Sequence, residues 1–282
     1  MKNILIRSLS GAVYVAIIVV LVLWGGQIGF PLLCCAFTIL GMTEFLQITT
    51  GGMSKNPAAS ALDLFLGLCI PVMVFYSLYL PVTYSHSFFI VMLGVFIMLA
   101  IIRLVMQLYS TSPRSLERMA YTIMSMVYVA LPLSAAVAVY NLAGPELTLF
   151  VFVLIWLNDT GAFLVGSAIG SHRLFARLSP KKSWEGFFGG LGFCIVAAYV
   201  AYMAVPGFGL MPRWQLVVLA VVVSVLSTWG DLFESMLKRN VGVKDSGNLM
   251  PGHGGVLDRI DSMLFVMPAT LVLIIFSNIF CN

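Results

Sequence analysis

The sequence predicts an all-α integral membrane protein. Hydrophobic residues make up 61% of the 282-residue chain, charged residues only 9%, and the mean hydropathy is +1.04. A soluble globular domain carries about 25% charged residues, and the core of one domain cannot absorb so much apolar surface. The bilayer must therefore be the solvent for most of the chain.

Apolar segments of membrane-spanning length follow one another along the whole sequence. A helix needs about 20 apolar residues to cross the hydrocarbon core, and by that measure the chain holds about nine transmembrane helices in a single polytopic domain, residues 1–282. Glycine pairs and prolines mark the turns between them. The expected spans are residues 8–24, 27–48, 60–80, 86–107, 118–141, 147–169, 186–204, 215–237 and 263–281.

The basic residues predict the orientation of these spans. All but Arg213 of the 15 lysines and arginines fall before the first span or in and around the turns after even-numbered spans. Loops rich in lysine and arginine stay in the cytoplasm, so the N-terminus is expected to be cytoplasmic. The charge of +4 is explained by this topology, and we expect no nucleic-acid partner.

Polar residues are unevenly distributed between the two halves of the chain. Residues 1–145 carry few ionisable groups away from span ends, which is typical of scaffold, lipid-facing or dimerisation spans. Residues 146–282 are expected to hold the catalytic spans and loops, with the active site on the cytoplasmic side. Five of the 11 acidic residues lie between Asp231 and Asp261.

The end of the expected span 215–237 carries a polar helix face. Asp231, Glu234, Ser235 and Lys238 recur at i, i+3, i+4 and i+7, so they share one face. A Glu234–Lys238 pair is also ordinary near a helix end. An intramembrane aspartate costs about 2.5–3.5 kcal/mol at the helix centre and usually lines a site or cavity. Asp231 is therefore a candidate functional residue.

Asp258 and Asp261 form a second acidic group at the entry to the last span. The dipole of a helix favours one acid in its first turn, which is the ordinary explanation. Two acids here and Asp231 on the preceding span make a group that needs a cation, and hard oxygen ligands suit Mg²⁺. The sequence therefore predicts Asp231, Asp258 and Asp261 as magnesium ligands.

Two further segments complete the candidate site. Residues 251–255 form a glycine-rich turn before a helix, where backbone N–H groups can hold an anion, although glycines also make ordinary turns. Asp159 lies inside the expected span 147–169 and is expected to face the same cavity as Asp231. The cytoplasmic loop 179–186 carries Lys181 and Lys182, which topology alone could explain, and two polar residues that could cap the next helix, Ser183 and Glu185.

The spacing of these polar residues resembles the signature of phosphatidate cytidylyltransferases, the CDP-diacylglycerol synthases. The segments that carry the resemblance are Ser235-x-x-Lys238-Arg239, Lys244-Asp245-x-Gly247 and Pro251-x-His253-Gly254-Gly255-x-x-Asp258-Arg259-x-Asp261, with Asn158-Asp159-Thr160 and Ser179-Pro180-Lys181-Lys182-Ser183-x-Glu185-Gly186 upstream. The resemblance is specific over residues 156–265, and no polar position of the signature departs from it.

The resemblance implies an enzyme of the bacterial inner membrane that joins CTP and phosphatidic acid into CDP-diacylglycerol and releases pyrophosphate. It also implies Mg²⁺, a second cation and a homodimer. The residues it makes catalytic are Asp231, Asp258, Asp261, Lys238 and Arg239. Those it places at the substrates are Asp159, Lys181, Lys182, Ser183, Glu185, Ser235, Lys244, Asp245, His253, Gly254, Gly255 and Arg259.

Two other functions fit parts of the pattern. A lipid-alcohol kinase that uses CTP would need similar phosphate and metal groups, and its product would be CDP rather than pyrophosphate. An ion-coupled transporter could carry its cation on Asp159 and Asp231, but transporters commonly show paired halves, and these halves are unlike. Acyl-enzyme, zinc-protease and P-loop mechanisms lack their motifs.

Overall fold

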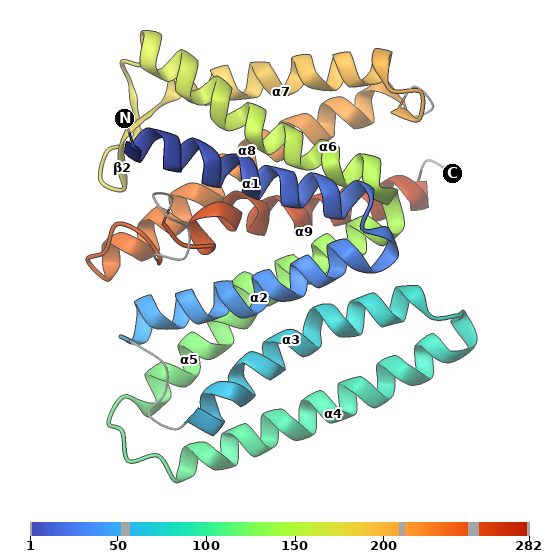
Figure 1. Ribbon diagram of the computed structural model, residues 1–282, viewed down its shortest axis with the longest axis vertical. Helices are drawn as coiled ribbons and strands as arrows, with labels where there is room; N and C mark the ends of the chain where they lie inside the picture. Colours follow the sequence, from blue (N-terminus) through green and yellow to red (C-terminus); the bar gives the residue numbers. More distant parts are fainter. Residues whose placement is uncertain (1, 52–56, 209–211, 248–253, 281–282) are drawn as a thin grey trace. The chain divides into compact units, whose positions relative to one another are not determined.

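The structure is a computed structural model that describes residues 2–51, 57–208, 212–247 and 254–280, with side chains described between Leu9 and Ser277. Helices dominate it (Figure 1). They are α1 (Lys2–Leu23), α2 (Gly26–Thr50), α3 (Pro57–Tyr79), α4 (Val82–Leu108), α5 (Ser115–Ser125), the π-helical turn η1 (Met126–Ala130), α6 (Leu131–Ile169), α7 (Trp184–Ala204), α8 (Arg213–Asn240) and α9 (Leu257–Phe280). The all-α prediction is confirmed apart from a short hairpin of β1 (Arg173–Phe175) and β2 (Ser179–Ser183).

Seven helices in the described ranges are long and apolar enough to cross a membrane. The continuous run from Ser115 to Ile169 counts once among them, and the apolar part of α1, Leu9–Leu23, is shorter than the others. Inside that run Gly144 adopts φ 82° and ψ 173°, a conformation open to glycine, and Pro145 lacks the N–H that would continue the helix. The helix therefore breaks at the turn predicted between residues 141 and 147.

The chain packs into two compact units. The first comprises Met1–Gly144 with Asp245–Arg259, and the second comprises Pro145–Lys244 with Ile260–Asn282. The stretch of polar signature residues is therefore shared between the units, and α9 begins in the first and continues in the second.

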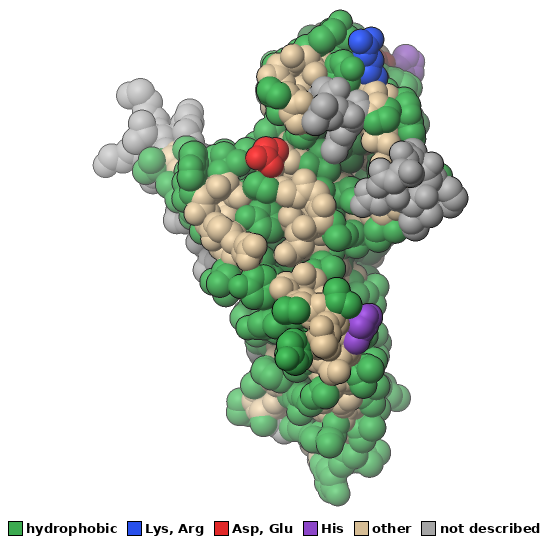
Figure 2. Space-filling model, turned by 90° about the vertical axis from the view of Figure 1, so that its right-hand side faces the viewer, with side chains coloured by type: hydrophobic (Ala, Val, Ile, Leu, Met, Phe, Trp, Pro, Cys, Tyr) green, Lys and Arg blue, Asp and Glu red, His purple; other side chains and the backbone are tan. Residues whose placement is uncertain are grey.

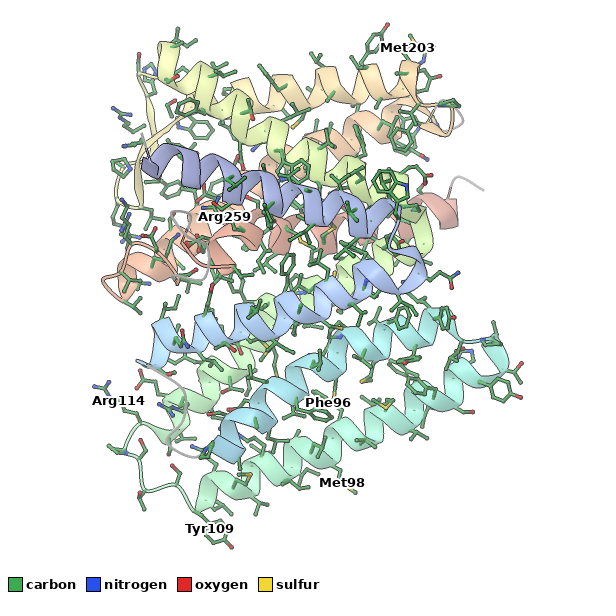
Figure 3. The ribbon with its side chains drawn as sticks, viewed as in Figure 1. Phe96, Met98, Tyr109, Arg114, Met203 and Arg259 are labelled. Carbon is green, nitrogen blue, oxygen red and sulfur yellow. The ribbon has the colours of Figure 1, made fainter. Side chains whose placement is uncertain are left out.

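In the first unit α2 packs against α1, α3 and α5, and α3 runs beside α4 (Figure 1). Phe96 of α4 points toward α3, whereas Met98 points away and is 60% exposed (Figure 3). A buried ion pair joins α3 to α4: Asp63 Oδ1 lies 2.6 Å from Arg103 Nε. Large apolar side chains cover the outer face of α4, as expected of a surface that meets lipid.

The surface of the protein agrees with a membrane environment. In the view of Figure 2 hydrophobic side chains prevail and charged side chains are few. An exposed apolar surface of this extent would aggregate in water, but lipid tails solvate it.

In the second unit α7 packs along α8, and the hairpin leads directly into α7 (Figure 1). Small residues permit α6 and α7 to lie close together, since the Cα of Gly186 on α7 lies 3.3 Å from where a Cβ of Gly166 on α6 would stand. Close packing at small residues is the usual basis of helix association in membranes. The contact brings the start of α7 against the part of α6 that carries Asp159.

Candidate active site

The polar face predicted on α8 is present. Lys238 Nζ donates to Glu234 Oε2 at 2.6 Å, and Ser235 Oγ donates to Asp231 Oδ1 at 3.4 Å. Both pairs are four residues apart, the spacing that brings helix side chains together. The side chain of Glu234 is only 1% exposed, so this acid is held inside the protein by its lysine.

Three carboxylates of the second unit converge. Oxygen atoms of Asp231, Glu234 and Asp261 all lie within 4.8 Å of one another. Asp231 and Asp261 were both predicted to bind a metal, whereas the sequence suggested for Glu234 only a pair with Lys238. The helical spacing of Asp231 and Glu234 was a usable signal, since both face the same side of α8.

A cavity of about 550 Å³ opens beside these carboxylates. That volume is in the range of sites for small molecules. Asp159, Lys181, Lys182, Ser183 and Asp231 are among its lining residues, so the prediction that Asp159 and Asp231 face one cavity is confirmed. Lys182 Nζ lies 2.5 Å from Asp231 Oδ2 and so joins the hairpin to α8.

The hairpin is fixed to α7 at the mouth of this cavity. Ser183 caps α7, because its Oγ accepts a hydrogen bond from the backbone N–H of Gly186 at 3.1 Å. Glu185, in the first turn of α7, accepts from the backbone N–H of His172 and lies 2.6 Å from His172 Nδ1. The capping role predicted for Ser183 is confirmed, and the carboxylate of Glu185 is engaged with the start of the hairpin.

The wall of the cavity on α6 is held by a buried polar contact. Asn158 is 2% exposed, and its Oδ1 accepts a hydrogen bond from Ser224 Oγ of α8 at 2.6 Å. Gly190 of α7 lies so close to Asn158 that a Cβ there would stand 2.6 Å from Asn158 Oδ1. These contacts fix the segment of α6 that carries Asp159.

In the first unit the signature residues build the start of α9. Asp258 Oδ2 accepts hydrogen bonds from the backbone N–H groups of Ser246 at 3.0 Å and of Gly255 at 2.8 Å. Gly254 has φ +80°, a conformation that favours glycine. Asp258, in the first turn of α9, therefore holds the backbone at Ser246 and at Gly255, and its predicted role as a metal ligand stays a prediction.

Glu44 of α2 reaches the same loop and was absent from the predicted site. Its carboxylate accepts from Ser246 Oγ at 3.0 Å and from the backbone N–H groups of Val256 at 2.9 Å and Leu257 at 2.8 Å. Glu44 is 7% exposed. The available signal was a lone acid inside the expected span 27–48, because an intramembrane acid is rarely without a role.

The remaining predicted residues lie at the surface of their units. Arg239, Lys244, Asp245 and Arg259 are exposed, and an Arg239 Nη donates to the carbonyl oxygen of Val243 at 3.3 Å. The carbonyl oxygen of Arg259 accepts a hydrogen bond from the hydroxyl of Tyr14 of α1 at 3.0 Å. Pro251 and His253 of the predicted signature lie outside the described ranges, as does Lys55.

Comparison with known proteins identifies the family. The model of the cytidylyltransferase family matches residues 5–277. The chain belongs to the cytidylyltransferase family. The phosphatidate cytidylyltransferase of Staphylococcus epidermidis is 33% identical over 270 residues, which cover 96% of this chain and 98% of the relative.

Other staphylococcal relatives of this cytidylyltransferase carry the same name. The phosphatidate cytidylyltransferase of Staphylococcus aureus is 32% identical over 96% of this chain and 98% of its own length. That of Staphylococcus saprophyticus is 40% identical over 55% of this chain and 59% of its own. The resemblance found in the signature thus extends to the full chain, and the protein is an enzyme of nucleotidyl transfer.

Proposed function

We propose that this cytidylyltransferase transfers the cytidylyl group of CTP to phosphatidic acid, giving CDP-diacylglycerol and pyrophosphate for phospholipid synthesis. The observation that carries the proposal is full-length similarity to phosphatidate cytidylyltransferases in a chain whose second unit has an acid-lined and lysine-lined cavity. An apolar helical protein suits a diacyl substrate, which stays dissolved in the bilayer while its phosphate reaches the cavity.

The chain would span the bacterial inner membrane about nine times, with a cytoplasmic N-terminus and a site that faces the cytoplasm. The distribution of lysine and arginine supports this orientation. The break at Gly144 supports two spans within the long run from α5 to α6. CTP is a cytoplasmic nucleotide, so a cytoplasmic site gives it direct access. We also propose a homodimer, as the family resemblance implies.

The carboxylates of Asp231, Glu234 and Asp261 fit a magnesium ion. Mg²⁺ prefers hard oxygen ligands, and three carboxylates within 4.8 Å of one another offer them. The group already attracts cations, as the contact of Asp231 with the Lys182 ammonium indicates. Bound there, Mg²⁺ would offset the negative charge of the triphosphate. The sequence adds Asp258 as a candidate ligand, and the family resemblance implies a second cation.

The chain's own groups would position the reacting phosphates. Lys181 and Lys182 present positive charge at the cavity on a hairpin whose end is anchored by the Ser183 cap. Asp159 would shape the part of the cavity that the lipid headgroup enters. Lys238, Arg239, Lys244 and Arg259 are proposed to hold phosphates of CTP or phosphatidate, with Asp245, Ser235, His253, Gly254 and Gly255 beside them.

The reaction needs no covalent enzyme intermediate. An oxygen of the phosphatidate phosphate attacks the α-phosphorus of CTP, and a new P–O bond forms. The bond from the α-phosphorus to the bridging oxygen breaks, and pyrophosphate leaves with that electron pair. No general base is required, because a phosphate monoester with a second pKa of about 6 is already ionised near neutral pH. Catalysis then consists of positioning and charge neutralisation.

The test is a product assay on the purified full chain in detergent. With CTP, phosphatidate and Mg²⁺ we expect pyrophosphate and CDP-diacylglycerol in equal amounts, and none when any of the three is left out. Formation of CDP with a phosphorylated lipid alcohol would instead identify the kinase. Absence of both products, together with cation-dependent solute uptake into proteoliposomes, would identify the transporter.

A further inference from the structure

Glu44 is a buried carboxylate that the proposed chemistry does not use. It lies on α2, about 200 residues before the loop that it contacts, and both belong to the first unit. Its carboxylate accepts three hydrogen bonds from that loop, two from backbone N–H groups and one from the Ser246 hydroxyl. Removal of this acceptor would leave the N–H groups of Val256 and Leu257 buried without a partner.

The contact lies at the N-terminus of α9. The first N–H groups of a helix have no partner within the helix, and a negative charge placed there is favoured by the helix dipole. Glu44 supplies this charge at Leu257, the first residue of α9, from a different helix. Glu44 therefore caps the N-terminus of α9 as an N-cap residue would, and it links α2 to the signature residues.

Two glycines of the signature fit closely around Glu44. A Cβ at Gly247 would stand 2.7 Å from Glu44 Oε1, and the three nearest atoms it would meet all belong to the Glu44 side chain. A Cβ at Gly255 would overlap the Glu44 carboxylate and Ser246 Oγ. The glycine pattern of the loop thus has a physical reason, which is the close approach of this carboxylate.

We propose that Glu44 is a positioning residue of the active site. It holds residues 246–247 and 255–257, which flank the loop of the signature, together with the start of α9 in the arrangement that the reaction needs. It acts through residues that the proposed function uses, among them Asp245, Asp258 and Arg259. Its effect on activity therefore rests on that proposed function, whereas its effect on the loop does not. Glu44 itself touches neither substrate in this scheme.

The experiment compares Glu44→Gln with a matched control in the full chain. Asp63→Asn removes another buried carboxylate of the first unit, one that is bound to Arg103 and not to the loop. For Glu44→Gln we expect amide hydrogen exchange in the peptide containing Ser246, Val256 and Leu257 to become at least tenfold faster. We expect kcat/KM for CTP to fall at least tenfold. Asp63→Asn should lower the melting temperature but change both quantities by less than about twofold.

A double-substitution cycle gives a second, independent measurement. In the native background Gly247→Ala should lower kcat/KM for CTP at least fivefold, because its methyl group meets Glu44. In the Glu44→Ala background the same substitution should cost less than twofold, since its neighbour is gone. Equal losses in the two backgrounds would show that the glycine does not accommodate Glu44.

The outcomes separate this proposal from the proposed function. If the native protein makes no CDP-diacylglycerol but Glu44→Gln still speeds amide exchange at Ser246, Val256 and Leu257, the proposed function is wrong and the contact of Glu44 with these residues is supported. If Glu44→Gln keeps native exchange in the loop and native kcat/KM, the positioning role is wrong. The positioning role is also wrong if Asp63→Asn lowers the melting temperature as much as Glu44→Gln does and loses as much kcat/KM.

Discussion

Neutralising Asp261 should stabilise the protein in the absence of divalent ions. Asp261 is 9% exposed and lies within 4.8 Å of two other carboxylates, Asp231 and Glu234. At an effective dielectric constant of about 20, two such carboxylates would repel by up to about 3.5 kcal/mol at this distance when both are ionised. In the described part of the chain, the lysines beside this group form their ion pairs with Asp231 and Glu234.

The two lysines offset part of this repulsion, so the net gain from Asp261→Asn should be about 2 kcal/mol. In a chain of this size such a gain corresponds to a rise in melting temperature of about 5 °C. The assay is thermal unfolding of detergent-purified protein, followed by tryptophan fluorescence in chelator and again with Mg²⁺. Native protein should gain stability from Mg²⁺, by about 2.7 kcal/mol at a concentration 100 times Kd, and Asp261→Asn should lose most of that gain.

Asp63→Asn is the control for the sign of this effect. Asp63 is also buried but is bound to Arg103, and breaking a buried ion pair costs about 3–5 kcal/mol. Its removal should therefore destabilise the protein in chelator. If Asp261→Asn also destabilises the protein in chelator, or if it keeps the native response to Mg²⁺, the three carboxylates do not form a repulsive, cation-binding group.

Two further predictions concern the second unit. Lys182→Met removes the ammonium beside Asp231, and we expect kcat/KM for CTP to fall by a factor of about 10 to 100, the cost of one or two charge-assisted contacts. Lys182→Arg keeps the charge and should recover part of this loss. If both variants lose the same kcat/KM, the charge of Lys182 is not the cause. Gly190→Ala should lower stability by about 1–3 kcal/mol, because its methyl group would meet Asn158, whereas Gly192→Ala on the same helix meets nothing within 4 Å and should be neutral. Both glycine variants can be compared by thermal unfolding, and similar melting temperatures would contradict the close approach of α6 and α7.

The helices and much of the site in the second unit could be predicted from the sequence. Hydropathy is sufficient to locate apolar helices, because each must satisfy its backbone hydrogen bonds internally. The helical spacing of Asp231, Glu234 and Lys238 was sufficient to predict their shared face, since that relation is local.

Relations between distant segments were less accessible. Residues 179–186 were predicted as a cytoplasmic loop, and the pairing of residues 179–183 with residues 173–175 in a hairpin was not predicted. From the sequence, Glu44 was only one of the few acids in the half assigned to scaffold spans. The residues next to it in the chain do not indicate which loop its carboxylate contacts. Only the packing of α2 in the first unit reveals that this acid serves a segment about 200 residues away.

The start of α9 changes the interpretation of the glycine-rich turn. The sequence predicted that this turn and helix N-terminus would offer backbone N–H groups to a polyphosphate. In the structure the N–H of Gly255 donates to Asp258, and those of Val256 and Leu257 donate to Glu44. The anions at this N-terminus are therefore the protein's own carboxylates, and a phosphate arriving there would meet their negative charge. In the described residues 255–257 these N–H groups are thus already engaged, and Gly247 and Gly255 let the backbone pass close to Glu44.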